Sequence, residues 1–104
     1  MKPDQVLSLL GIARKSGNVK TGSFQVEESV KGNKAFLVIH AKDASERTKK
    51  DLHDMCRYYQ VPIREYGTRE SLSKSVGRED IVVISITDEN LSDAVLKKMD
   101  AKPL

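Results

Sequence analysis

The sequence has no tryptophan, one cysteine and few aromatic residues. Cys56 is the single cysteine, and two Phe and three Tyr are the large aromatics. One cysteine excludes an internal disulfide and a cysteine-built zinc site, and it fits a reducing cytoplasm. The scarcity of aromatics disfavours a platform on which many bases stack. No apolar run at the N-terminus is long enough for a signal peptide or a membrane span, so we expect a cytoplasmic protein with no membrane part.

Charge is distributed unequally between the two halves of the chain. The 104 residues carry a net charge of +3, and 32% of them are charged. Residues 1–50 hold ten Lys and Arg against five Asp and Glu, whereas residues 51–104 hold eight against ten. The length fits one domain, residues 1–104, and 38% hydrophobic residues are enough for a core. The basic first half favours an anionic partner.

Segments of helical periodicity alternate with short apolar runs. The periodicity predicts five helices that begin near residues 1, 22, 45, 68 and 88. The apolar runs predict strands at residues 19–20, 34–41, 61–66 and 81–86. The run at 34–41 does not alternate, which is typical of a strand covered on both faces, and Pro62 places its strand at an edge or a strand start. This order predicts an α/β fold, a three-layer α/β/α sandwich whose sheet is at least partly parallel.

Several helix ends carry residues that suit those positions. Pro3 fits a first helical turn, Gly77 fits a helix C-terminus, and Pro103 closes the chain. Arg14 and Lys15 either complement the dipole at the end of the first helix or extend a basic patch. Side-chain caps are expected from Thr21 or Ser23, Asp43 or Ser45, Thr68, and Thr87 or Asp88.

Residues 19–31 combine a basic residue, a glycine and a helix start. Lys20 precedes Gly22, where a backbone or a ligand can approach closely, and Val26 and Val30 give the helix a buried side. A helix N-terminus of this kind can hold a phosphate on its N–H groups. A plain amphipathic surface helix explains the same pattern, and the stretch alone leaves both interpretations open.

Few residues favour an enzymatic role. His40 and Asp43 lie at the end of an apolar strand, where ligands of α/β proteins gather, and His53 lies on the third helix. The two histidines have no spaced partner for a metal site or a general base. There is also no Gly-rich phosphate loop and no Gly-x-Ser-x-Gly elbow. Cys56 falls on an apolar helix stripe and is expected in the core. We expect no enzyme and no metal or cofactor.

Six segments, taken in their order and spacing, match one family pattern. They are residues 10–17 (LGIARKSG), 21–22 (TG), 34–45 (KAFLVIHAKDAS), 61–63 (VPI), 72–77 (LSKSVG) and 81–88 (IVVISITD). With these segments the chain resembles the L7Ae type of ribosomal protein, which binds kink-turn RNA, and within it the small bacterial YlxQ-like branch. The resemblance covers almost the whole chain.

The resemblance implies an α/β/α sandwich around a mixed four-stranded sheet and an RNA site in two parts. One part is the helix start after a glycine, where an Asn-Glu pair and a Lys three residues beyond the Glu meet the sheared G·A pairs of the kink. These positions map to Phe24, Gln25 and Glu28. The other part is the loop between the fourth helix and the last strand, which holds a flipped-out base and maps to residues 77–80.

The mapped positions at the helix start differ from the family pattern. Gln25 replaces a Glu and accepts hydrogen bonds only as a neutral amide. Glu28 replaces a Lys and repels phosphate instead of attracting it. Phe24 replaces an Asn and either stacks on a base or covers the helix start. Gly22 is kept, and the loop at residues 77–80 is one residue shorter.

We therefore expect a non-catalytic RNA-binding protein that recognises structured, kink-turn-like RNA, with ribosomal RNA as its partner and a monomeric state. The alternative is a protein-interaction module on the same fold with weakened or lost RNA binding, which Glu27 and Glu28 beside the site favour. The expected RNA-binding residues are Lys20, Thr21, Gly22, Ser23, Phe24, Gln25, Glu28, Lys31, Gly77, Arg78 and Glu79.

Overall fold

The computed structural model describes residues 4–100, so the expectations for Pro3 and Pro103 lie outside the described residues. Residues 4–100 form five helices and four strands. No helix in this range combines the length and the apolar character needed to span a bilayer. In chain order the elements are α1 (Gln5–Lys15), β1 (Val19–Thr21), α2 (Ser23–Lys31), β2 (Leu37–His40), α3 (Glu46–Tyr59), β3 (Ile63–Glu65), α4 (Arg69–Ser75), β4 (Val83–Ile86) and α5 (Glu89–Asp100).

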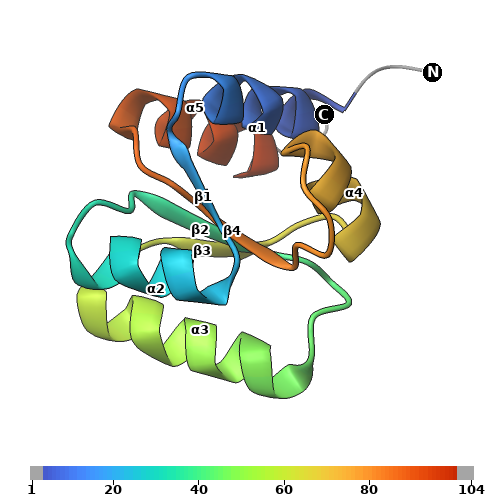
Figure 1. The fold of residues 1–104 in the computed structure, drawn as a ribbon. Coiled ribbons are helices and arrows are strands. Elements are labelled where there is room, and N and C mark those ends of the chain that lie inside the picture. Colours follow the sequence, from blue (N-terminus) through green and yellow to red (C-terminus); the bar gives the residue numbers. More distant parts are fainter. Residues whose placement is uncertain (1–3, 101–104) are drawn as a thin grey trace.

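The strands form one mixed four-stranded sheet, as the resemblance implied, and their order is β1-β4-β2-β3 (Figure 1). β4 is antiparallel to both of its neighbours, with Thr21 opposite Ile84 and Leu37 opposite Ile86. β2 and β3 are parallel, and the connection between them runs through α3. β3 is an edge strand that begins directly after Pro62, which has no N–H to donate to a neighbour.

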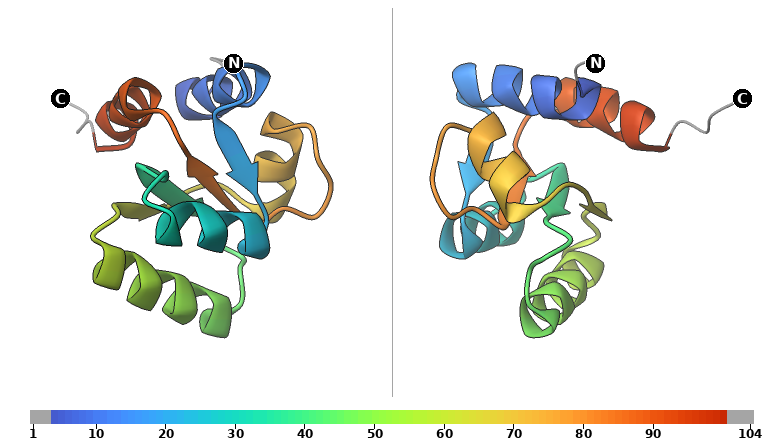
Figure 2. Two further views of the ribbon diagram at one scale, coloured as in Figure 1. Left: turned by 60° about the vertical axis from the view of Figure 1, so that its left-hand side comes forward. Right: turned by 90° about the vertical axis from the view of Figure 1, so that its right-hand side faces the viewer.

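The helices cover both faces of the sheet, so the predicted three-layer sandwich is confirmed. α1, α4 and α5 lie on one face, and α2 and α3 lie on the other (Figures 1 and 2). β2 and β4 are buried along their full lengths, in agreement with their mostly apolar sequences, and His40 and Ser85 are the polar residues buried in them. α1 packs against α4, and β1 leads from the end of α1 into α2, which brings these elements to one side of the molecule.

Alternate residues of the two central strands divide the core in two. Val38 faces α2 and α3, where Cys56 is 1% exposed and burial raises the pKa of its thiol to about 11. This confirms the core position expected for Cys56, and each large apolar side chain buried here stabilises the fold by about 1.5–3 kcal/mol. The core under α1, α4 and α5 contains Val6, Leu10, Leu37, Ile39, Leu72, Val76, Ile84, Ile86 and Val95.

Helix α2 has no side-chain cap, so the expectation that Thr21 or Ser23 caps it is wrong. Thr21 belongs to β1, Ser23 is already the first helical residue, and Gly22 occupies the capping position without a side chain. Each of the other three helices for which we expected a side-chain cap has one of the expected residues in that role. Ser45 accepts from the N–H of Thr48, Thr68 accepts from the N–H of Ser71, and Asp88 accepts from the N–H of Leu91.

Candidate nucleic-acid interface

The start of α2 is tied to β4 through the backbone of Gly22. Gly22 has φ +87°, a conformation that a residue with a Cβ rarely adopts. Its N–H donates to the carbonyl oxygen of Val83 at 3.0 Å, so this N–H is not among the groups at the helix start that can hold a phosphate. The N–H groups of Ser23 and Phe24 belong to the uncapped first turn, where a helix has no carbonyl partners of its own.

The loop between α4 and β4 is held at both ends by Ser73. The N–H of Arg78 donates to the carbonyl oxygen of Ser73 at 3.0 Å, and the N–H of Ile81 donates to Ser73 Oγ at 2.8 Å. Gly77 has φ +64° and ends α4, as its sequence position predicted. These bonds give residues 77–80 a defined position beside α2.

The two parts of the expected site line one groove, although more than fifty residues separate them in the sequence. We call it the loop groove; its lining residues are Arg14, Thr21, Gln25, Gly77, Arg78, Glu79 and Ile81. On one wall, the N–H of Thr21 donates to Gln25 Oε1 at 3.3 Å, so the amide of Gln25 is oriented by its own helix start. The fold thus brings together five of the eleven expected residues.

A second hollow adjoins the loop groove at Gln25. We call it the helix groove; it is lined by Lys20, Gln25, Glu28, Ser29, Gly32 and Lys34. Lys20 is exposed on the edge strand β1, and Lys34 is exposed just beyond α2. The carboxylate of Glu28 therefore lies in a hollow that two lysines also line. This arrangement keeps Lys20 and Glu28 beside the expected RNA site.

Ser23 and Lys31 are not with the other expected residues. Both line a groove between α2 and α3, where Tyr58 is 80% exposed. Lys31 Nζ lies 2.6 Å from Glu27 Oε1, and this hydrogen bond raises the pKa of Lys31. Lys31 therefore lies apart from the expected RNA-binding residues that line the loop groove.

Phe24 is 73% exposed at the start of α2. The sequence left two roles open for this side chain, stacking on a base or covering the helix start. A side chain with this exposure does not cover the helix start, so the covering role is wrong. Its ring face remains accessible to a base.

Arg14 lines the loop groove and was not among the expected site residues. It lies in the last turn of α1, where a basic residue is ordinary, so the sequence position alone did not distinguish it. The one signal in the sequence was the alternative that Arg14 extends a basic patch; its contact with Gly77 becomes visible only in the fold. A Cβ added to Gly77 would lie 3.3 Å from Arg14 Cζ.

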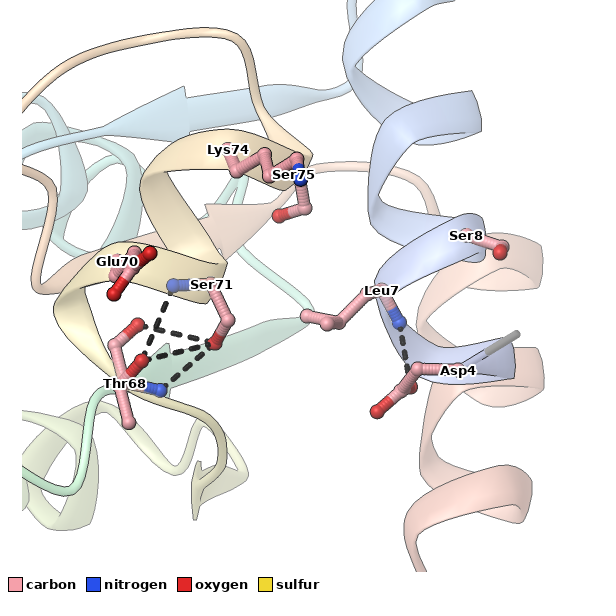
Figure 3. A pocket seen from close by; sticks show the side chains of 8 residues that line it. All are labelled: Asp4, Leu7, Ser8, Thr68, Glu70, Ser71, Lys74 and Ser75. Atoms are coloured by element: carbon pink, nitrogen blue, oxygen red, sulfur yellow. Dashed lines mark hydrogen bonds between the residues drawn. The ribbon is translucent and has the colours of Figure 1, made fainter. Parts of the chain in front are cut away.

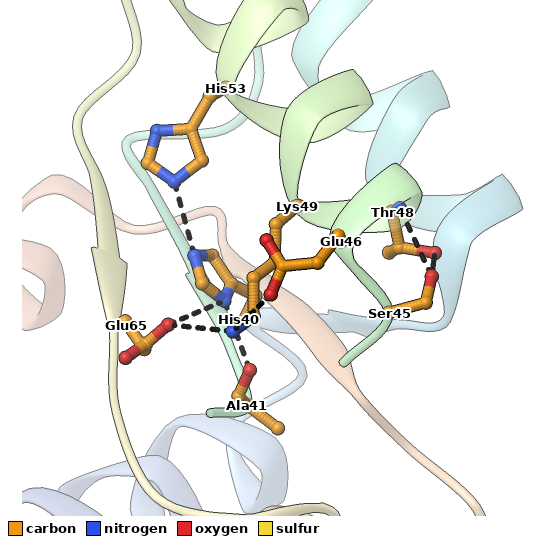
Figure 4. Close-up of polar contacts among 8 residues, drawn as sticks. All are labelled: His40, Ala41, Ser45, Glu46, Thr48, Lys49, His53 and Glu65. Atoms are coloured by element: carbon orange, nitrogen blue, oxygen red, sulfur yellow. Dashed lines mark hydrogen bonds and ion pairs between the residues drawn. The ribbon is translucent and has the colours of Figure 1, made fainter. Parts of the chain in front are cut away.

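His40 and His53, for which the sequence showed no spaced partner for a metal site or a general base, contact each other in the fold (Figure 4). Their Nε2 atoms are 3.2 Å apart, since β2 ends beneath the middle of α3. Asp43 accepts from the N–H of Arg69 at 2.8 Å instead of capping α3. Within residues 4–100, no three His, Cys, Asp or Glu side chains lie close enough together to bind a metal ion.

A further groove lies between α1 and α4 (Figure 3). Thr68 and Ser71, which line it, make the reciprocal capping bonds at the start of α4. Asp4 caps α1 by accepting from the N–H of Leu7 at 3.0 Å. These polar groups are accounted for by helix capping, and none of them belongs to the expected site.

Comparisons with known proteins agree with the resemblance. The model of the ribosomal protein L7Ae/L30e/S12e/Gadd45 family matches residues 4–96. The RNA-binding protein YlxQ of Bacillus subtilis is 34% identical over 92 residues, which cover 88% of this chain and 92% of the relative. The RNA-binding protein YlxQ of Enterococcus faecium is 32% identical over 74 residues, covering 71% of this chain and 72% of the relative.

Two solved structures share the fold over nearly the whole chain. A protein of unknown function from Bacillus halodurans superposes with a TM-score of 0.92 at 35% identity, covering 95% of this chain and all of that one. The Giardia lamblia 15.5kD RNA binding protein superposes with a TM-score of 0.75 at 23% identity, covering 94% of this chain and 90% of that one.

Proposed function

Because the chain belongs to the ribosomal protein L7Ae/L30e/S12e/Gadd45 family, we propose that it is a non-catalytic protein that binds structured RNA. The RNA is kinked, and its strand enters the loop groove between the start of α2 and the α4–β4 loop. One observation carries this proposal: Thr21 and Gln25 line the same groove as residues 77–79. The names of the two bacterial relatives support RNA as the ligand class. Ribosomal RNA in the cytoplasm is the form of RNA that the family name favours.

The charges of the two grooves suit a bent polyanion. Arg14 and Arg78 line the loop groove, and Lys20 and Lys34 line the helix groove. Such cations neutralise phosphates and release counterions, which supplies most of the sequence-independent affinity for RNA. The exposed ring of Phe24 adds a face on which one unpaired base can stack.

Gln25 is placed to read base edges, because its side chain lines both grooves. Its Oε1 accepts from Thr21 N–H, and its amide group retains donor and acceptor capacity for a base. A neutral amide makes weaker hydrogen bonds to guanine N–H groups than a carboxylate does. We therefore expect moderate affinity for a kinked RNA and a measurable preference over a straight duplex.

The proposal is tested by titrating the protein with a kink-turn RNA and with a plain duplex of equal length, at several salt concentrations. Tighter binding of the kinked RNA, with affinity that falls as salt rises, is the expected result. Equal affinity for the two RNAs removes the kink-specific part. If neither RNA binds at low salt, RNA binding is wrong and the protein-interaction alternative remains.

The substitution Gln25→Glu is expected to raise affinity for the kinked RNA several-fold. The carboxylate still accepts from Thr21 N–H, and its charge strengthens hydrogen bonds from guanine. The affinity for the duplex should stay the same or fall slightly, since the added charge repels phosphate. Gln5→Glu is the matched control, because Gln5 is exposed on α1 outside both grooves. A loss of affinity for both RNAs with Gln25→Glu contradicts a guanine-reading role.

A further inference from the structure

The guanidinium of Arg14 lies flat against the backbone of Gly77. A Cβ added to Gly77 would meet Arg14 Cζ at 3.3 Å, Nη1 at 3.4 Å and Nη2 at 3.5 Å. Three nearly equal distances mean that the face of the planar group, and not its edge, covers this glycine. An added Cβ would be in tight to ordinary van der Waals contact with the guanidinium, and it is the φ of +64° that favours glycine at position 77.

The position of Arg14 is determined by the packing of α1. Ala13, its neighbour, is fully buried, and α1 packs along α4, whose C-terminus leads into Gly77. A Cβ on Gly11 would lie 3.4 Å from the carbonyl oxygen of Ser75, so the two helices approach closely near the loop. Arg14 and the loop therefore keep their relative placement without a hydrogen bond between them.

The N–H groups of Arg14 have no partner within the described part of the chain. Arg64 and Arg69 bind the carboxylates of Asp100 and Asp80. By contrast, no hydrogen bond or ion pair within residues 4–100 engages the side chain of Arg14, which is exposed in the loop groove. A guanidinium presents five donors in a fork that fits the two oxygens of a phosphate. Gly77 covers its face and leaves this edge available.

We propose that Arg14 binds a backbone phosphate of the RNA and joins the two parts of the site. This proposal rests on the proposed function. Arg14 adds a third element, α1, to the walls that α2 and the α4–β4 loop supply. A strand that bends into the loop groove would bring a phosphate to the guanidinium fork, and we expect a straight duplex to reach it less well. The contact with Arg14 therefore contributes to the preference for kinked RNA as well as to affinity.

The test compares Arg14→Ala, Arg14→Lys and Lys15→Ala in titrations with the kinked and the duplex RNA. Arg14→Ala should weaken binding of the kinked RNA roughly ten- to a hundredfold, the usual effect of losing a hydrogen-bonded charge contact. It should also reduce the slope of log K against log salt by roughly one. Arg14→Lys keeps the charge and the slope but loses the fork, so at most part of the affinity returns. Lys15→Ala should change affinity less than threefold.

Each outcome has one meaning. If the wild type prefers the kinked RNA but Arg14→Ala and Lys15→Ala bind it equally well, the role of Arg14 is wrong and the proposed function stands. If the wild type binds no RNA at low salt, the proposed function itself is wrong. Full recovery in Arg14→Lys contradicts bidentate binding. Thermal unfolding of each variant must stay within a few degrees of the wild type, as expected for an exposed side chain.

Discussion

His40 is 1% exposed, and the protein supplies a partner for each of its ring nitrogens. Nδ1 lies 3.1 Å from the carbonyl oxygen of Ala41, so the tautomer that satisfies both contacts carries its proton on Nδ1. Nε2 then accepts from the Nε2–H of His53. Nδ1 keeps its partner whatever occupies position 53, whereas Nε2 of His40 depends on His53.

We predict that His53→Ala lowers the free energy of unfolding by about 1 kcal/mol at pH 8, because Nε2 of His40 loses its protein donor. Urea denaturation measures the change. Arg57→Ala on the same helix, also exposed, should stay within about 0.5 kcal/mol of the wild type. In a His40→Leu background the loss caused by His53→Ala should disappear; if it persists, the contact between the two rings is not its cause.

Single residues were predicted well where burial alone decides their role and poorly where a distant partner decides it. The apolar stripe of α3 was enough to place Cys56 in the core. The pair of His40 and His53 depends on which end of β2 lies beneath α3, and no periodicity in the sequence carries that information. The choice between Asp43 and Ser45 as the cap of α3 stayed open in the sequence for the same reason, because the N–H that Asp43 accepts from belongs to the distant Arg69.

Among the elements, α1 is joined to the segment after β3 through one side chain. Tyr66 Oη donates to Asp4 Oδ2 at 2.6 Å, and the same carboxylate caps α1. Burial on its own raises the pKa of Asp4, but the hydrogen bonds from Tyr66 and Leu7 outweigh it and hold the pKa below its usual value. Burial, followed by the bond to Asp4, raises the pKa of Tyr66 to about 12.

These directions predict how the stability of the α1 attachment depends on pH. The contribution of Asp4 is present above the usual carboxyl pKa of about 4 and is lost as the pH falls through the lower folded-state value. Tyr66→Phe should therefore lower the melting temperature at pH 6 and have a smaller effect near pH 2. Tyr58→Phe is the control, since Tyr58 is 80% exposed. A Tyr66→Phe effect that does not change between these pH values contradicts the coupling to Asp4.

The boundaries of the elements differ from the prediction where backbone bonds leave the regular pattern. The strand expected at 34–41 begins only at Leu37, because the N–H groups of Lys34 and Ala35 donate to Ser29 and close the end of α2. Hydrophobicity predicted that the run is buried. It did not predict that the N–H groups of Lys34 and Ala35 bond to the end of α2 instead of to a neighbouring strand. The missing cap of α2 has a similar origin, since β1 extends to Thr21 by pairing with β4.

For the molecule as a whole, sheet order determines which distant residues meet. β1 pairs with β4, so the turn into α2 lies beside the loop that precedes β4. Composition and periodicity predict the three layers but not this order. The two-part site was predicted from the family resemblance. Arg14 could be recognised as part of the site only from the packing of α1 on α4. The separation of Lys31 from the site likewise follows from the side of α2 that faces α3.

The distribution of charge over the whole surface leads to a last prediction. Glu28→Lys and Asp93→Lys each raise the net charge of +3 by two, but Glu28 lies in the helix groove and Asp93 lies on α5 across the sheet. If phosphates occupy the helix groove, Glu28→Lys should strengthen RNA binding several-fold and steepen the slope of log K against log salt by roughly one. Asp93→Lys should change both far less, because screening in salt limits the reach of a surface charge to about 10 Å. Equal gains from the two substitutions in the same titrations mean that RNA responds only to net charge, and a bound strand beside Lys20 and Lys34 is then excluded.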